Sequence, residues 1–254
     1  MCRHIAYVGP ALTIGRLVFE PPHGLLRQSW APRRQRHGTV NADGFGLGWY
    51  APGDPRPARY RRATPIWGDE GAADLARVVR THGLLAAVRD ATRPGADGEA
   101  AAAPFAADAW LFSHNGMLPG WPEGPAVELA ARVLPARALW ESAARTDSAL
   151  VWALVLERLR AGREPGAALV ETVAELARAA PGARLNLLLT DGVRIHATAW
   201  GDSLWWRAGP EPGGTVVASE PFDDEPGWRE VPDRTLVTAD PAGAVLTAFE
   251  ESVR

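Results

Sequence analysis

The chain has 254 residues, of which 46% are hydrophobic, and its formal net charge is −3. This length and apolar content suffice to bury a substantial core, so we expect one compact domain over residues 2–254. The 27 basic residues are all Arg, are scattered among 30 acidic residues and form no basic stripe, which excludes a nucleic-acid surface. One Cys excludes a disulfide framework, and no stretch approaches the ~20 apolar residues of a membrane helix. We therefore expect a cytoplasmic protein with no nucleic-acid or membrane partner.

The first half of the chain alternates short apolar runs with one longer amphipathic segment. The runs at 4–9, 44–51 and 83–88 have the length and composition of strands. A helix is predicted over 69–83, because apolar residues follow helical spacing and Gly83 marks a stop.

The second half predicts two helices and then a return to strands. Apolar faces at helical spacing predict helices over 147–162 and around 166–179. The segment 184–200 carries Asp191-Gly192 between apolar runs, which indicates a β-hairpin. Further strands are predicted at 203–208, 215–219, 235–239 and 244–249, and surface loops at 93–104 and 119–126. Hairpin-linked strands with grouped helices favour an α+β fold with antiparallel sheets.

The only Cys stands at position 2. If the initiator Met is removed, Cys2 carries both a thiol and a free α-amino group. An α-amino group has an unperturbed pKa of ~7.7 to 8.0, so near neutrality it can accept the thiol proton and serve as the base of an N-terminal nucleophile. The alternative is that Cys2 is a small apolar residue at the start of a strand.

The stretch WLFSHNGML, residues 110–118, ends an apolar run with His114, Asn115 and Gly116. The Asn carboxamide N–H beside an unobstructed glycine backbone could form an oxyanion hole. The same Asn-Gly pair is also the commonest hairpin turn, so both interpretations stay open here.

Two further features suggest charged ligand groups. Arg89 leaves a predicted strand and Thr92 follows it, and together they offer a planar guanidinium and a hydroxyl to a carboxylate. Alternatively, Arg89 is exposed to solvent or pairs with Asp90. Asp147, in RTDSAL, precedes a helical run and could hold a substrate ammonium, although Thr146 or Asp147 could instead cap that helix.

A thiol, an oxyanion hole and two charged clamps together suit a γ-glutamyl group attacked at its side-chain carbonyl. At this point the chain resembles the class II glutamine amidotransferases of the N-terminal nucleophile hydrolase superfamily. The resemblance rests on MCR at the start, NADGFG at 41–46, AVRDAT at 86–92, HNG at 114–116 and TDS at 146–148, in the order of that family. It implies a four-layer α/β/β/α sandwich with two antiparallel sheets.

The resemblance also implies roles for particular residues. Cys2 corresponds to the catalytic nucleophile and base carrier, and Asn115 and Gly116 correspond to the oxyanion hole. Arg89 and Thr92 correspond to the α-carboxylate site. Asp147 corresponds to the α-amino site.

The function implied is hydrolysis of a γ-glutamyl amide in a small-molecule substrate, with no cofactor. One alternative is a glutaminase subunit that supplies ammonia to a partner synthase, and another is a catalytically silent γ-glutamyl-binding protein. A zinc site is not expected, because the His residues around Cys2 show no metal-ligand spacing. The sequence predicts no oligomeric state.

Overall fold

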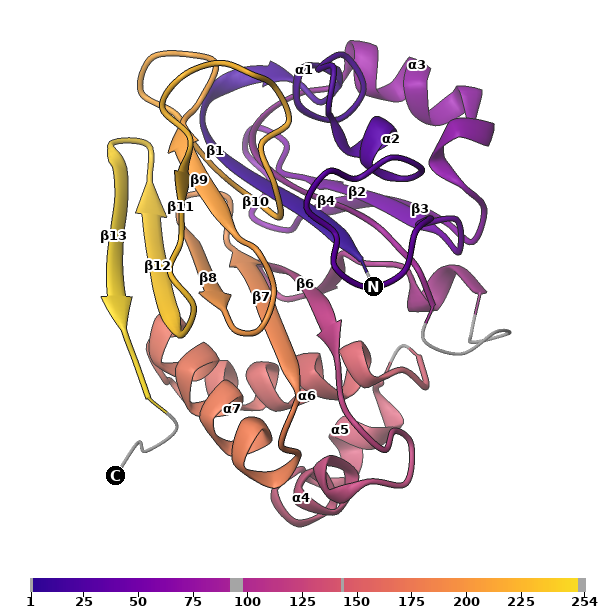
Figure 1. The fold of residues 1–254 in the computed structure, drawn as a ribbon, viewed down its shortest axis with the longest axis vertical. Coiled ribbons are helices and arrows are strands. Elements are labelled where there is room, and N and C mark those ends of the chain that lie inside the picture. The colour runs from indigo at the N-terminus through magenta and orange to yellow at the C-terminus, as the bar shows by residue number, and fades with distance from the viewer. Residues whose placement is uncertain (1, 92–97, 143, 251–254) are drawn as a thin grey trace.

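Two antiparallel sheets lie face to face between two layers of helices (Figure 1). This computed structural model describes residues 2–91, 98–142 and 144–250. One sheet has seven strands in the order β11-β9-β10-β1-β4-β2-β3, and the other has six in the order β13-β12-β8-β7-β6-β5. The predicted α+β class and the predicted α/β/β/α layering are therefore confirmed.

The seven-stranded sheet contains β1 (Arg3–Thr13), β2 (Phe45–Trp49), β3 (Ala58–Arg62), β4 (Arg80–Val88), β9 (Trp205–Ala208), β10 (Thr215–Ala218) and β11 (Arg229–Glu230). The six-stranded sheet contains β5 (Phe105–Ala107), β6 (Trp110–Met117), β7 (Arg184–Thr190), β8 (Ile195–Ala199), β12 (Thr235–Asp240) and β13 (Gly243–Ala248). The helices are α1 (Gly15–Val18), α2 (Leu25–Gln28), α3 (Glu70–Val78), α4 (Pro125–Val133), α5 (Ala136–Trp140), α6 (Asp147–Arg160) and α7 (Pro165–Ala179), with short 3₁₀ turns at Ile66–Gly68 and Gly98–Ala101.

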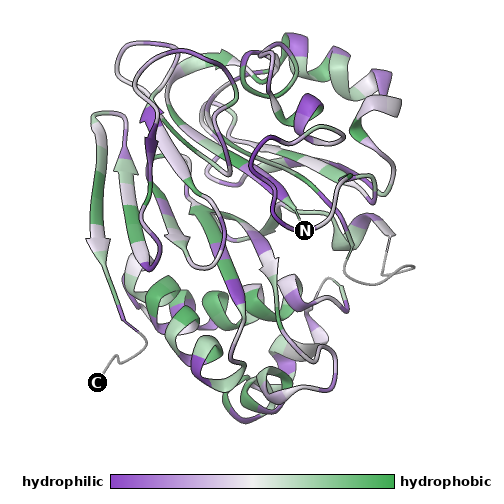
Figure 2. Cartoon of the chain, in the orientation of Figure 1, coloured by the Kyte–Doolittle hydropathy of each residue, from purple (hydrophilic) through white to green (hydrophobic). Residues whose placement is uncertain are grey.

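Alternating side chains divide the interior into three packed regions. On β1, Ala6 and Val8 point between the sheets and contact the core there, whereas Ile5 and Tyr7 point to the outer side, where α1 and α3 pack. Residues of β6 and β7 meet α6 and α7 on the far side of the other sheet. Figure 2 shows that hydrophobic residues dominate α6 and α7, whereas the loop beside the N-terminus is strongly hydrophilic.

The helix predicted over 69–83 is shorter than expected. It begins at Glu70, capped by the Asp69 carboxylate that accepts the N–H of Ala72, and it ends at Val78. From Arg80 onward the chain pairs with β1, and this strand pairing outweighs the local helical spacing. Gly83 does not end a helix. It is required because the Gly192 backbone packs closely against it: a Cβ at position 83 would lie 2.6 Å from the Gly192 Cα.

Two turn predictions have opposite outcomes. The hairpin at Asp191-Gly192 is confirmed: the Asp191 carboxylate accepts the N–H groups of Val193 and Arg194, and Gly192 has φ +85°. The turn interpretation of Asn115-Gly116 is wrong, because β6 continues through both residues to Met117 and pairs with β7. Both residues are thereby held in extended backbone inside a sheet.

Several short elements were not predicted from the sequence: α1, α2, β3, β5, β11, α4 and α5. Most have five residues or fewer, too short to show a period. The expected loop at 119–126 ends where α4 begins, at Pro125.

Candidate active site

Strand pairing brings Cys2 beside Arg89. In the antiparallel pair of β1 and β4, Arg3 lies opposite Val88, so the next pair outward is Cys2 and Arg89. Both residues line a cavity of about 360 Å³, whose other lining residues are Asp90, Ala91, Gly116, Trp121, Pro122, Arg145, Thr146, Asp147 and Ser148. Of the site residues predicted from sequence, Cys2, Arg89, Gly116 and Asp147 are therefore together at one cavity.

Asn115 contacts the backbone of Cys2. Its side-chain oxygen Oδ1 accepts a hydrogen bond of 3.2 Å from the backbone nitrogen of Cys2. Its Nδ2 is buried and has no hydrogen-bond partner among the described residues. An unpaired buried donor is costly, typically ~1–3 kcal/mol, so this one is a ready donor for an oxygen in the cavity.

Gly116 continues β6 beside Asn115 at a point where no side chain fits. A Cβ there would lie 1.9 Å from the Arg184 carbonyl oxygen and 2.6 Å from His114 Nε2. The His114 ring is fixed on both sides: Nε2 donates to the Arg184 carbonyl at 2.9 Å, so Nδ1 accepts from the Ser148 hydroxyl at 3.0 Å. This network anchors the strand that carries Asn115 and Gly116.

The NADGFG segment holds the loop that carries Arg89. The backbone N–H of Asp43 donates a hydrogen bond to the Arg89 carbonyl. In return, the Arg89 guanidinium donates to the Asp43 carbonyl at 3.2 Å. The Asp43 carboxylate accepts the N–H of Ala91 at 2.7 Å. The loop is thus fixed with Arg89 at the cavity wall. Thr92, predicted as its partner, lies outside the described residues.

Asp147 is the first residue of α6 and is 7% exposed. The cap of this helix is Thr146, whose hydroxyl accepts the N–H of Ala149. The Asp147 carboxylate accepts the N–H groups of Ser148 and Leu118, the latter just beyond β6. Of the two alternatives left open by the sequence, the side-chain cap therefore belongs to Thr146, and Asp147 lines the same cavity as Cys2.

The electrostatics keep the nucleophile neutral at rest. Burial raises the pKa of the Cys2 thiol, while the Asp90 backbone and the charge on Arg89 oppose that rise. His4 of β1, two residues after Cys2, lies between the sheets, with its Nδ1 3.1 Å from the Ser113 hydroxyl. Burial, reinforced by Arg3 and His114, lowers the pKa of His4 to about 3, so this ring is neutral at physiological pH.

Trp121, Pro122 and Arg145 are among the cavity residues that were not predicted as site residues from the sequence. The first two fall in the segment expected to be a surface loop, and a Trp in a Pro- and Gly-rich loop is the signal that could have found them. Within the described ranges, no cluster of three or more His, Cys, Asp or Glu could hold a metal ion. No helix in that part of the chain is long and apolar enough to cross a membrane.

Comparison with known proteins defines the class that this fold and site indicate. Residues 26–208 match the family model of class II glutamine amidotransferases, so the chain belongs to that family. A solved class II glutamine aminotransferase domain protein from Silicibacter pomeroyi has the same fold, with a TM-score of 0.71 at 24% identity over 98% of this chain and 100% of the other.

Two relatives resemble the chain over nearly its whole length. One is the γ-glutamyl-hercynylcysteine sulfoxide hydrolase of Mycolicibacterium smegmatis, 43% identical over 97% of this chain and 99% of the relative. The other is the γ-glutamyl-hercynylcysteine sulfoxide hydrolase of Mycobacterium tuberculosis, 41% identical over 99% of this chain and 98% of the relative.

Proposed function

We propose that this chain hydrolyses the γ-glutamyl amide of γ-glutamyl-hercynylcysteine sulfoxide, releasing glutamate and hercynylcysteine sulfoxide. The observation that carries the proposal is the set of groups around Cys2: Asn115, which contacts the Cys2 nitrogen and whose Nδ2 has no partner among the described residues, with Arg89 and Asp147 on the cavity wall. The extent of the similarity to the two mycobacterial hydrolases supports the particular substrate.

Binding places the glutamyl group by its two charged ends. Arg89 receives the α-carboxylate, with Thr92 as a further donor, and Asp147 receives the α-ammonium. The side-chain carbonyl then lies at Cys2. Because both clamp residues are fixed by backbone hydrogen bonds, little ordering remains when the substrate binds.

Acylation requires a base, because burial favours the protonated thiol. Removal of Met1 converts the backbone nitrogen of Cys2 into an α-amino group, which Asn115 Oδ1 orients through the existing 3.2 Å contact. The α-amino group takes the thiol proton as sulfur attacks the carbonyl. Asn115 Nδ2 and the Gly116 backbone stabilise the resulting oxyanion.

Collapse of the tetrahedral intermediate breaks the C–N bond, and the α-ammonium group gives its proton to the departing amine. Water then attacks the thioester, again with the α-amino group as base, and glutamate leaves. Every proton passes through groups of this chain or through water, so the scheme uses no cofactor.

The test is a glutamate-release assay with three substrates: the sulfoxide conjugate, γ-glutamylcysteine and glutamine. All three present the same glutamyl group to the clamp, so discrimination must come from the leaving group. We expect a much higher kcat/KM for the sulfoxide conjugate. Equal rates would overturn the specialised function in favour of a general amidohydrolase or an ammonia-supplying glutaminase, and binding without turnover would identify a silent γ-glutamyl-binding protein.

A further inference from the structure

A second cavity, of about 440 Å³, adjoins the Cys2 cavity. The two share Trp121, Pro122, Arg145 and Thr146, and Trp140 belongs to the second cavity alone. Trp140 is 89% exposed, so its ring is accessible to a ligand at this cavity. A substrate whose glutamyl end is bound at Cys2 can extend its leaving group into this second cavity.

Trp121 is partly buried against the hydrophobic core that contains α6 and α7, and Trp140 is exposed; both line the second cavity. Most of the eleven Trp residues take part in ring stacking or in cation–π contacts with Arg, namely Trp30, Trp67, Trp152, Trp200, Trp205, Trp206 and Trp228. Within the described ranges, neither Trp121 nor Trp140 makes such a contact. Both rings can therefore face a ligand.

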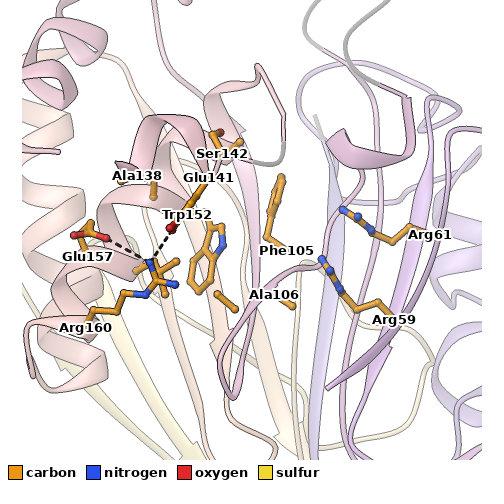
Figure 3. A pocket seen from close by; sticks show the side chains of 14 residues that line it. Arg59, Arg61, Phe105, Ala106, Ala138, Glu141, Ser142, Trp152, Glu157 and Arg160 are labelled. Atoms are coloured by element: carbon orange, nitrogen blue, oxygen red, sulfur yellow. Dashed lines mark hydrogen bonds and ion pairs between the residues drawn. The ribbon is translucent and has the colours of Figure 1, made fainter. Parts of the chain in front are cut away.

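A third cavity, of about 160 Å³, shows by contrast where a cation does not fit. It shares Ser142 and Ala153 with the second cavity. Figure 3 shows Arg59 and Arg61 pointing toward it from β3, and Arg160 facing them from the opposite wall. Arg160 pairs with Glu141 and Glu157, whereas Arg59 and Arg61 place two positive charges on the β3 wall, so a cationic ligand is repelled from that side.

The second cavity has a different charge distribution. Arg145 is the one charged side chain among its lining residues in the described part of the chain, and it lies where the second cavity meets the Cys2 cavity. This position suits a carboxylate close to the scissile amide. The Trp140 side of the cavity suits a group that binds to aromatic faces.

We propose that Trp121 and Trp140 form a subsite for a quaternary ammonium group at the far end of the leaving group, with Arg145 receiving the carboxylate next to the scissile nitrogen. The inference rests on the proposed function, because the hercynyl group is a trimethylated histidine and its permanent cation favours aromatic faces. The subsite would explain how a glutamyl clamp distinguishes this substrate from glutamine.

The experiment compares kcat/KM for the sulfoxide conjugate with that for an analogue carrying a primary ammonium in place of the trimethylammonium. We expect the unsubstituted enzyme to favour the trimethylated substrate by about tenfold, and Trp140→Ala and Trp121→Ala to lose this preference. Trp140→Phe should retain part of it, whereas Trp140→Leu should not. Trp67→Ala is the matched control, since Trp67 is also exposed, at 45%, and packs against Trp30 away from the cavity.

A second readout does not depend on turnover. Calorimetry on Cys2→Ala should detect binding of hercynine more tightly than of histidine, and the added Trp140→Ala change should remove the difference. A preference that survives both Trp substitutions, or an unsubstituted enzyme with no preference for the methylated substrate, would overturn the subsite. Failure of the proposed function has another signature, namely equal hydrolysis of glutamine and the conjugate.

Discussion

The Cys2 cavity lies at the start of α6, whereas the arginine-lined cavity of Figure 3 lies along α6 between Ala149 and Arg160; both are rich in charge. In the arginine-lined cavity, Arg160 already forms ion pairs with Glu141 and Glu157. In the Cys2 cavity, Arg89 and Asp147 come from separate segments, the end of β4 and the start of α6, and the buried Asn115 Nδ2 has no hydrogen-bond partner among the described residues. Charge density alone therefore does not distinguish a reactive site from a structural one.

The two cavities also differ in how the chain builds them. The Cys2 cavity gathers the beginning of β1, the end of β4, the end of β6 and the beginning of α6, which are far apart in sequence. Asn115 is held by the Cys2 backbone and Asp147 by the Leu118 backbone, whereas Arg89 is held by Asp43, which precedes β2. The substitutions below test whether this convergence, and not the amount of charge, determines activity.

The largest effect is expected at Cys2. Cys2→Ala should abolish glutamate release while leaving γ-glutamyl binding intact, because the clamp residues lie on other segments. A chain that retains Met1, or carries an N-terminal tag, should be equally inactive, since its nitrogen is then an amide and no base. Intact-mass analysis alongside the assay identifies the processed form. Full activity with a blocked N-terminus would rule out the mechanism.

Asn115→Ala should lower kcat by about 10² to 10³, the usual cost of losing one oxyanion-hole donor. Asn115→Asp separates its two roles, because it keeps an acceptor for the Cys2 nitrogen and removes the Nδ2 donor. Asn186→Ala is the matched control: Asn186 pairs with Asn115 across the sheet, but its amide is fully bonded to Trp200, Asp202 and Ser203. That variant should lose stability in urea unfolding with much less change in the kcat of the folded protein.

The fate of Asn115-Gly116 shows what sequence reasoning could and could not predict. Locally the pair is typical of a hairpin turn, and only pairing with β7, some 70 residues later in the chain, makes it a strand. Long amphipathic helices and the Asp191-Gly192 hairpin were predictable because their signals are local. The α3 end, the short β3 and the position of Trp121 at the cavity depend on tertiary contacts, which no local periodicity in the sequence indicates.

The next largest effects are expected from substitutions at Arg89 and Asp147, the two charged residues proposed to bind the glutamyl group. Arg89→Gln and Asp147→Asn should each weaken productive binding by about 2 to 5 kcal/mol, because one charged end of the ligand loses its partner. The effect should appear mainly in KM and in the glutamate inhibition constant. Asp69→Ala, which removes the side-chain cap of α3, controls for simple helix capping and should cost ~1 kcal/mol of stability with unchanged KM. Wild-type kinetics with Asp147→Asn would return Asp147 to a structural role.

His4 gives the Cys2 region a pH dependence. Its pKa is about 3 in the folded chain, lowered mainly by burial, against ~6.5 when unfolded, so protonation favours the unfolded state. This contribution to stability is complete above pH 6.5 and is lost as the pH falls toward 3, at about 1.4 kcal/mol per pH unit. Urea unfolding between pH 7 and 4 should therefore show a flatter profile for His4→Gln than for the unsubstituted protein. Parallel profiles would contradict the buried neutral ring.

The smallest effect is expected at the arginine-lined cavity. There, replacing Arg59 by Gln, the same substitution as at Arg89, should change activity very little. The Arg59 guanidinium donates a hydrogen bond to the Pro104 carbonyl. Burial and the neighbouring Arg61 lower the pKa of Arg59. Replacing Arg59 therefore removes one hydrogen bond but also relieves the repulsion between the two Arg side chains. Arg59→Gln should leave kcat/KM for the sulfoxide conjugate within about twofold and unfolding stability within about 0.5 kcal/mol. Arg89→Gln, assayed in parallel, serves as the positive control. A tenfold loss with Arg59→Gln would mean that the substrate extends past Ser142 into this cavity, because no described contact links Arg59 to the Cys2 cavity by another route.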